Sequence, residues 1–172
     1  ALNFAGNSEQ IVAYKDGTNL WSPGSADGSP SGTVSDIAVF MTLQLTQTGQ
    51  DIMPFNLGFG GRIRHDDHDL VPFENRIDAQ DLASLNTTYL LVWEYSDSLN
   101  HKKHFLNGTQ KFTGTTSGPS TIEGAFHFPD LTGAPNYKVG EIIVNRGIIS
   151  VAQRELVEGY LGTKWGVTLN SH

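Results

Sequence analysis

Short stretches of alternating apolar and polar residues, separated by turns rich in glycine and proline, dominate the chain and predict β-strands. The clearest stretch is 89–95, whose sequence is Tyr-Leu-Leu-Val-Trp-Glu-Tyr. The stretch 37–45 is apolar at first and then alternates, as expected of a central sandwich strand that runs out into solvent. We expect both strands to contribute to the core, and Trp93 with them.

Weaker stretches complete the predicted sheets, and they are 1–7, 10–14, 52–59, 62–65, 104–106, 110–112, 122–128 and 139–144. The first two are expected to pair as an edge hairpin. Asn107 and Gly108 favour a tight hairpin turn between two later strands, because both residues tolerate positive φ. The polar segments 16–33 and 65–69 are predicted to be surface loops.

One stretch has a helical pattern, and it begins after Ser150. The Ser150 hydroxyl can cap the first turn, and Gln153 three residues later completes a capping box. The expected buried face consists of Leu156, Val157, Tyr160 and Leu161, opposite Arg154, Glu155 and Glu158. Gly162 is expected to supply the left-handed C-terminal cap, after which Trp165 returns to the body of the domain.

Length and composition fit one domain over residues 1–172 with a single core. The formal charge of −7 repels polyanions and argues against a nucleic-acid partner. The lack of cysteine excludes disulfides, thiol nucleophiles and zinc–thiolate sites. Because the apolar runs are short and the N-terminus has no charged-then-apolar signal pattern, we expect no membrane span.

The C-terminal region resembles that of bacterial and phage LamG-like jelly-roll domains, which belong to the concanavalin A-like lectin and glucanase superfamily. The matching residues are 148–150, 154–155, 157–161 and 164–167, while 1–6 resembles the first strand of that family and 105–108 its late hairpin. The resemblance implies an all-β, two-sheet antiparallel jelly-roll sandwich with one short C-terminal α-helix. Lectins, laminin G modules, glycan-binding appendages and some polysaccharide-cleaving enzymes share this fold, so the fold does not choose the function.

No recognised catalytic pattern occurs along the sequence. Glucanases of this fold carry acidic residues at alternating positions of one strand, in an ExDxxE arrangement that this chain lacks. Glu94 and Asp97 are three residues apart and would face opposite sides of a regular strand. The strand motifs of polysaccharide lyases and the GxSxG nucleophile elbow are also missing. We therefore expect a non-enzyme, with a polysaccharide-cleaving enzyme as the lesser alternative.

The loop 65–69 is the candidate metal site. Asp66, Asp67 and Asp69 offer the hard oxygen ligands that Ca²⁺ prefers, and laminin G-type sandwiches often bind this ion beside the ligand face. His65 and His68 would suit a transition metal instead. The spacing matches no recognised calcium loop, and a solvated polar loop is the simpler interpretation.

A glycan site needs flat aromatic rings at a rim, together with amide and charged groups that bind hydroxyls. Trp21, in the loop 16–33, fits this description best. The residues expected around it are Tyr14, Asn19, Asn56, Arg62, Arg64 and Tyr137. Each of them is also explained as an ordinary surface or core-edge side chain. The basic run 101–104, His-Lys-Lys-His, is expected to be a solvated hairpin edge and is assigned no partner.

These observations favour a non-catalytic module that binds a glycan or polysaccharide in adhesion. The alternative is a structural phage virion protein, a capsid decoration or tail component, that docks the same sandwich on a capsid lattice and forms a homo-oligomer within that assembly. The absence of a signal pattern and of a linker favours this alternative. Both functions place the protein outside the cell or on the virion surface.

Overall fold

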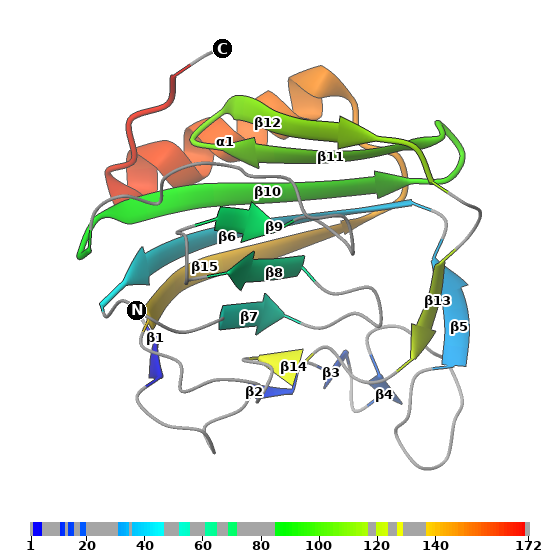
Figure 1. Cartoon of the computed structure of the whole chain (residues 1–172), viewed down its shortest axis with the longest axis horizontal. Helices are drawn as coiled ribbons and strands as arrows, with labels where there is room; N and C mark the ends of the chain where they lie inside the picture. Colours follow the sequence, from blue (N-terminus) through cyan, green and yellow to red (C-terminus); the bar gives the residue numbers. More distant parts are fainter. Residues whose placement is uncertain are drawn as a thin grey trace.

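The computed structural model describes the backbone of residues 2–4, 11–12, 14–15, 18–19, 31–34, 36–46, 52–55, 61–64, 69–71, 85–116, 120–123, 127–128 and 137–170. Side chains are described for residues 36–44, 46, 85–116, 138–145 and 147–170. These parts of the chain form antiparallel strands and one C-terminal helix (Figure 1).

Six strands form the main antiparallel sheet (Figure 1). In spatial order they are β1 (Leu2–Phe4), β15 (Tyr137–Arg146), β6 (Asp36–Leu45), β10 (Thr88–Ser96), β11 (His101–Leu106) and β12 (Thr109–Gly114). β6 and β10 are the two strands predicted most clearly, and they pair at the centre of the sheet from Thr88–Gln44 to Ser96–Asp36. Their nearly continuous apolar sequence is explained by this central position.

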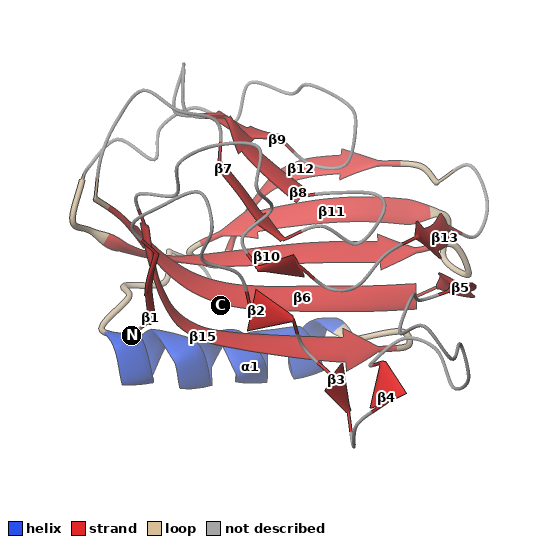
Figure 2. Cartoon of the chain, turned by 90° about the horizontal axis from the view of Figure 1, so that it is seen from below, coloured by secondary structure: helices blue, strands red, loops and turns tan. Residues whose placement is uncertain are grey.

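The remaining described strands form smaller antiparallel groups. They are β2 (Ile11–Val12) with β14 (His127–Phe128), β3 (Tyr14–Lys15) with β4 (Thr18–Asn19), β5 (Ser31–Val34) with β13 (Ser120–Glu123), and the triplet β7 (Ile52–Phe55), β8 (Gly61–Arg64) and β9 (Asp69–Val71). The triplet lies on one face of the main sheet, and the helix α1 (Val151–Trp165) lies on the other (Figure 2). The chain is therefore an all-β, two-sheet antiparallel jelly-roll sandwich with one C-terminal α-helix, as predicted.

Both faces of the main sheet are buried at its centre. Successive residues of a strand point to opposite faces, and successive residues of β6 and β10 are buried. On the face toward α1 the described core consists of Ala38, Phe40, Leu90, Val92, Phe105, Leu161 and Val167. On the opposite face the alternate buried residues of the central strands are Val39, Met41, Leu43, Leu91 and Trp93. The prediction that Trp93 belongs to the core is confirmed.

The predicted hairpin turn between β11 and β12 is confirmed. Asn107 has a φ of 49° and Gly108 a φ of 81°, the left-handed conformations that a tight hairpin turn requires. The turn is also bound to β10. The Asn107 backbone N–H donates to the Leu90 carbonyl at 2.8 Å, and the Leu90 N–H donates to Asn107 Oδ1 at 2.9 Å.

The start of α1 is as predicted, and its end is not. Gln153 N–H donates to the Ser150 hydroxyl at 3.2 Å and the Gln153 side chain accepts from Ser150 N–H at 2.9 Å, which completes the capping box. The prediction of Gly162 as the C-terminal cap is wrong. The helix continues to Trp165, and the left-handed residue is Gly166, with a φ of 68°. Gly162 instead contacts the chain that follows the helix, where a Cβ would lie 3.2 Å from Leu169.

The predicted orientation of α1 is also wrong. Leu156 is 75% exposed and Tyr160 is 48% exposed, whereas Arg154 is buried and Glu158 is 0% exposed. Of the predicted apolar face, only Leu161 belongs to the buried core, with Val157 half-buried beside it. The sheet offers Arg154 a carboxylate and an aromatic ring, described below, and these contacts turn its side of the helix inward.

Several predicted strand details are corrected. The segments 1–7 and 10–14 do not form a hairpin, because β1 pairs with β15 while β2 pairs with β14. The segment 16–33 contains strand residues of β4 and β5, and Asp69 begins β9 rather than ending a loop. The predicted strand 122–128 is two strands with different partners. The partners of β1, β2, β5 and β13 are distant in sequence, and alternation alone cannot reveal such pairings.

In the described part of the chain, the one helix is too short and too polar to span a lipid bilayer.

Candidate functional site

A hollow of about 60 Å³ opens where α1 ends above the main sheet. We call it the Trp165 hollow, after the last residue of the helix, which lines one side. Its floor contains a polar row in which Thr88 of β10, Gln44 of β6 and Lys138 of β15 lie side by side in register. The row is accessible because the helix that covers the rest of this face stops at Trp165.

A bulge in β15 shapes the wall of the hollow. The register of β15 against β6 shifts here, so that Gly140 and Glu141 both lie opposite Thr42. The Glu141 backbone N–H donates to the Thr42 hydroxyl at 2.9 Å. A Cβ at position 140 would lie 2.5 Å from Thr42 Oγ1 and 2.9 Å from the Trp165 ring. Glycine at this position therefore lets the indole approach the sheet closely.

Glu141 holds the indole in place. Trp165 Nε1 donates to Glu141 Oε2 at 3.2 Å, and the Tyr160 hydroxyl donates to Glu141 Oε1 at 3.2 Å. Lys164 Nζ lies 2.9 Å from Glu141 Oε2 and donates to the Tyr160 hydroxyl at 2.7 Å. The hydrogen bond from Lys164 lowers the pKa of Glu141, and the contacts with Tyr160 and Glu141 raise the pKa of Lys164. Both groups are therefore charged at neutral pH and compensate each other.

The free groups of the hollow match those of a carbohydrate site. A part-exposed indole can stack on the apolar C–H face of a sugar ring. Gln44 donates its amide N–H to the Asn86 carbonyl at 2.6 Å, which leaves its amide oxygen as an acceptor. The Thr88 hydroxyl can donate and accept, and the Lys138 ammonium can only donate.

A second polar cluster lies fully between the sheet and α1. Arg154 donates to both oxygens of Glu158 at 3.1 and 2.9 Å, and its Nε lies 3.3 Å from Glu94 Oε1. The guanidinium also lies 3.9 Å from the centre of the Phe105 ring, a cation–π geometry. The paired charges and the ring explain why these polar side chains point inward.

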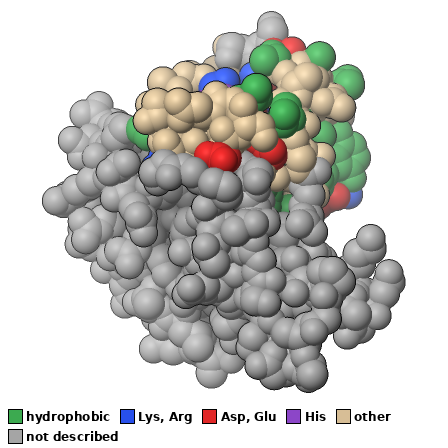
Figure 3. All heavy atoms as spheres, turned by 90° about the vertical axis from the view of Figure 1, so that its right-hand side faces the viewer, with side chains coloured by type: hydrophobic (Ala, Val, Ile, Leu, Met, Phe, Trp, Pro, Cys, Tyr) green, Lys and Arg blue, Asp and Glu red, His purple; other side chains and the backbone are tan. Residues whose placement is uncertain are grey.

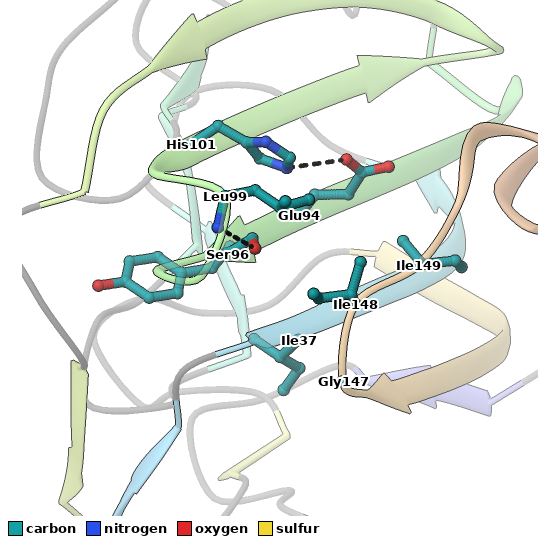
Figure 4. Close-up of a pocket in the computed structure, with 9 residues that line it drawn as sticks. Ile37, Glu94, Ser96, Leu99, His101, Gly147, Ile148 and Ile149 are labelled. Carbon is teal, nitrogen blue, oxygen red and sulfur yellow. Dashed lines mark hydrogen bonds and ion pairs between the residues drawn. The ribbon is translucent and has the colours of Figure 1, made fainter.

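Glu94 also faces a small hollow at the opposite end of the sheet from Trp165. Figure 4 shows its carboxylate and the His101 ring pointing toward each other from neighbouring strands, with 3.6 Å between Glu94 Oε2 and His101 Nε2. Burial raises the pKa of Glu94 and lowers the pKa of His101. The hollow has a volume of about 10 Å³, which holds roughly one water and no sugar ring. We therefore assign this cluster to helix docking.

A wider surface groove of about 460 Å³ runs between α1 and the chain that follows it. Glycines 159, 162 and 166 form much of its lining, with Thr163, Val167, Thr168 and Leu169. It has neither a charged side chain nor an aromatic ring, so it offers less to a polar ligand than the Trp165 hollow does.

The predicted glycan and metal residues lie where no side chain is described. Trp21, Asn56, Asp66 and Asp67 are outside the described residues. Tyr14 is placed on β3, Asn19 on β4, Arg62 and Arg64 on β8, Tyr137 on β15 and Asp69 on β9, by their backbone alone. Whether these residues form a glycan or Ca²⁺ site stays a prediction. Within the described part, no group of three or more acidic, histidine or cysteine side chains is arranged to hold a metal ion.

The basic run 101–104 is not the solvated edge that we predicted. It is β11, which lies between β10 and β12 in the sheet. His104 is 0% exposed and stacks on Trp93 with 5.1 Å between ring centres. Neither ring nitrogen of His104 has a hydrogen-bond partner within the described structure, and burial lowers its pKa to about 3. The prediction that Glu94 and Asp97 face opposite sides of one strand does not apply either. Asp97 lies in the turn after β10 and accepts a hydrogen bond from the Thr116 hydroxyl.

Sequence reasoning missed the residues of the Trp165 hollow. Because Trp165 is aromatic and follows an apolar helix, it was predicted to pack on the body of the domain. No neighbouring sequence feature indicated that Thr88, Gln44 and Lys138 lie in one row. Gly140 within an otherwise regular strand pattern was the available signal, because an isolated glycine in a strand often marks a bulge or a close approach.

No family model matches the chain, and no curated protein sequence matches it either. The fold is similar to that of the botulinum neurotoxin serotype D binding domain, with a TM-score of 0.62 and 11% identity over 92% of this chain and 41% of that chain. The ligand-binding domain of the same serotype, solved in complex with N-acetylneuraminic acid, matches with a TM-score of 0.62, 9% identity and the same coverages. The sialidase of Trypanosoma rangeli matches with a TM-score of 0.54 and 11% identity over 94% of this chain and 32% of that one. The chain thus spans about two fifths of those binding domains, and the likeness is one of fold: a β-sandwich of a type found in carbohydrate-binding proteins.

Proposed function

We propose that the protein is a non-catalytic glycan-binding module and that the Trp165 hollow is one of its carbohydrate subsites. The observation that carries the proposal is the indole of Trp165, fixed by Glu141 and standing beside an accessible row of hydroxyl, amide and ammonium groups. A ring held in this way loses little conformational freedom when a sugar stacks on it, which favours binding.

The structural neighbours support this proposal at the level of fold. One neighbour is a ligand-binding domain solved with N-acetylneuraminic acid, and another is a sialidase. The residues that bind ligand in those proteins are not carried over to this chain, because identity is 9–11%. We retain the LamG-like type as a proposal that rests on the sequence segments alone.

The loop containing Trp21 and the aspartates 66, 67 and 69 remain proposals as well. Trp21 would supply a second glycan contact, with Ca²⁺ held by the three aspartates beside it. Both proposals rest on residue type and predicted loop position.

The alternative of a polysaccharide-cleaving enzyme is weakened by the position of Glu94, its best candidate for a catalytic carboxylate. Glu94 is 6% exposed, faces α1 and contacts Arg154, so it has no access to a glycosidic bond. We therefore keep the module non-catalytic, and the sialidase likeness contributes an argument about fold only.

A glycan microarray followed by calorimetry tests the proposed function. The wild-type protein is expected to bind at least one glycan class, with affinity in the micromolar to millimolar range. Trp165→Ala should abolish that binding, and so should Thr88→Tyr, which fills the hollow and keeps the indole. Thr113→Tyr on the exposed surface of β12 is the matched control. Binding that survives in both hollow variants, in folded protein, would exclude this subsite.

A structural role in a phage particle is the second candidate, and the surface of α1 favours it. Figure 3 shows hydrophobic side chains on the described part of the surface that faces the viewer. The large hydrophobic residues that are exposed include Leu99, Ile148 and, on α1, Val151 and Leu156. A capsid lattice would cover such a surface, and the module would then form a homo-oligomer on the virion. Co-sedimentation with purified capsids tests this candidate. Either function implies an extracellular or virion-surface location.

A further inference from the structure

We propose that the Trp165 hollow selects sugars that carry a carboxylate, and that Lys138 binds this group. The inference rests on the proposed function, because it assumes that the hollow accepts a sugar at all. It adds the chemical class of the ligand and the residue that distinguishes that class from neutral sugars.

Lys138 is the cation on the floor of the hollow, placed in register with Gln44 on the neighbouring strand. It is half-buried, and it forms no ion pair with any described carboxylate. Lys164 at the end of α1 is different, because Glu141 compensates its charge at 2.9 Å. A partly desolvated ammonium without a counter-charge attracts an anion more strongly than an exposed one does.

The carboxylate at the hollow is already occupied. Glu141 accepts from Tyr160, Trp165 and Lys164, so little of its capacity is left for the hydroxyls of a ligand. Among the described side chains that line the hollow, the Gln44 amide oxygen and the Thr88 hydroxyl remain as acceptors. Within this described lining, two weak acceptors and one cation without a described ion-pair partner favour a ligand that brings an anionic group of its own.

The size of the hollow fits this class of ligand. A volume of about 60 Å³ is several times what one water needs, and it is small beside a pocket that encloses a whole ligand. It therefore fits one edge of a single sugar ring. A ring stacked on the Trp165 indole would direct a carboxyl substituent across the floor toward Lys138.

Calorimetric titrations with matched ligands test the inference. The probes are 3′-sialyllactose, its carboxyl methyl ester, and an oligoglucuronide with its ester, so that two sources of a sugar carboxylate are compared. The wild-type protein is expected to bind at least one of the acids roughly tenfold or more tightly than its ester, since a charged hydrogen bond is lost. Lys138→Gln should reduce the affinity for that acid to the level of the ester. Lys111→Gln, on exposed β12, makes the same charge change away from the hollow and should leave the affinity unchanged.

The outcomes separate this inference from the proposed function. Equal affinity for acid and ester, or an unchanged acid affinity in Lys138→Gln, would overturn the carboxylate selection while leaving glycan binding intact. If no acid, ester or neutral glycan binds, both the proposed function and this inference are wrong.

Discussion

Three charged side chains buried between α1 and the sheet depend on one another. Arg154 is shared by Glu94 and Glu158, and each carboxylate raises the electrostatic energy of the other. Removing charges from water costs several kcal/mol per ion, and the cost is offset only while the pairing is complete. Such a cluster fixes where the helix docks more than it adds net stability.

We predict that Arg154→Met strongly destabilises the fold. The substitution keeps an apolar stem but leaves two buried carboxylates without their shared cation, which should cost about 3–5 kcal/mol of unfolding free energy. Glu155→Gln is the control, because Glu155 lies 3.9 Å from Arg154 at a part-exposed position and should change stability by less than about 1 kcal/mol. Urea denaturation measures both values. Similar losses in the two variants would contradict this account of the cluster.

His104 predicts a pH dependence of stability. Its pKa is about 3 in the folded protein and near 6.5 in the unfolded chain, so between these values the unfolded state binds a proton that the folded state does not. Stability should therefore fall as pH falls through this window, by at most about 1.4 kcal/mol per pH unit from this group.

His104→Leu isolates this effect. The variant should lose stability less steeply between pH 6.5 and pH 4 than the wild-type protein, as measured by denaturation at a series of pH values. Glu94 contributes with the opposite sign, because its pKa is raised, but it is present in both proteins and cancels in the comparison. Parallel curves would show that His104 titrates as an ordinary surface histidine.

At the scale of elements, α1 shows which features a local sequence pattern can predict and which it cannot. Ser150, Gln153 and the turn at Asn107–Gly108 were predicted correctly because a cap or a tight turn involves residues a few positions apart. The face of α1 was predicted wrongly because the decision depends on Glu94 and Phe105, more than 40 residues away in sequence. The pattern of apolar residues favoured burial of the face with Leu156. The contacts of Arg154 with Glu94 and Phe105 instead bring the opposite face against the sheet.

We predict opposite results for two leucines of the helix. Leu161→Ala removes a fully buried side chain and should cost about 2–5 kcal/mol. Leu156→Ala removes an exposed side chain and should change stability by less than about 0.5 kcal/mol. Thermal and urea unfolding of the two variants measures the difference. A larger loss for Leu156→Ala would restore the orientation of α1 that the sequence pattern predicted.

The bulge in β15 gives a second pair of contrasting variants. Gly140→Ala would place a methyl group against Thr42 and the Trp165 ring, so it should displace the indole, lower stability and weaken glycan binding. Gly159→Ala meets nothing within 4 Å and lies inside the helix, where alanine is favoured by up to about 1 kcal/mol. Indole fluorescence and unfolding measurements follow both changes. A Gly140→Ala protein with unaltered fluorescence and binding would show that the close approach is not needed.

For the whole molecule, alternation and turn residues predicted the sandwich, because both faces of a central sheet demand apolar strands such as β6 and β10. Pairings such as β1 with β15 could not be predicted, since they join residues more than 130 positions apart. The Trp165 hollow also depends on long-range pairings, because Thr88, Gln44 and Lys138 meet only once β10, β6 and β15 are neighbours. Trp21 was the better candidate from sequence, since its loop position could be inferred locally.

The most direct test of the proposed glycan site is a two-dimensional NMR titration of the ¹⁵N-labelled protein with both acids, 3′-sialyllactose and the oligoglucuronide, which follows the indole N–H signals of Trp21, Trp93 and Trp165. Our account predicts that the Trp165 indole signal shifts together with the amides of Gln44 and Lys138, while the buried Trp93 signal stays in place. If the two acids shift the Trp21 signal alone, or if neither shifts any tryptophan signal, the result would contradict it.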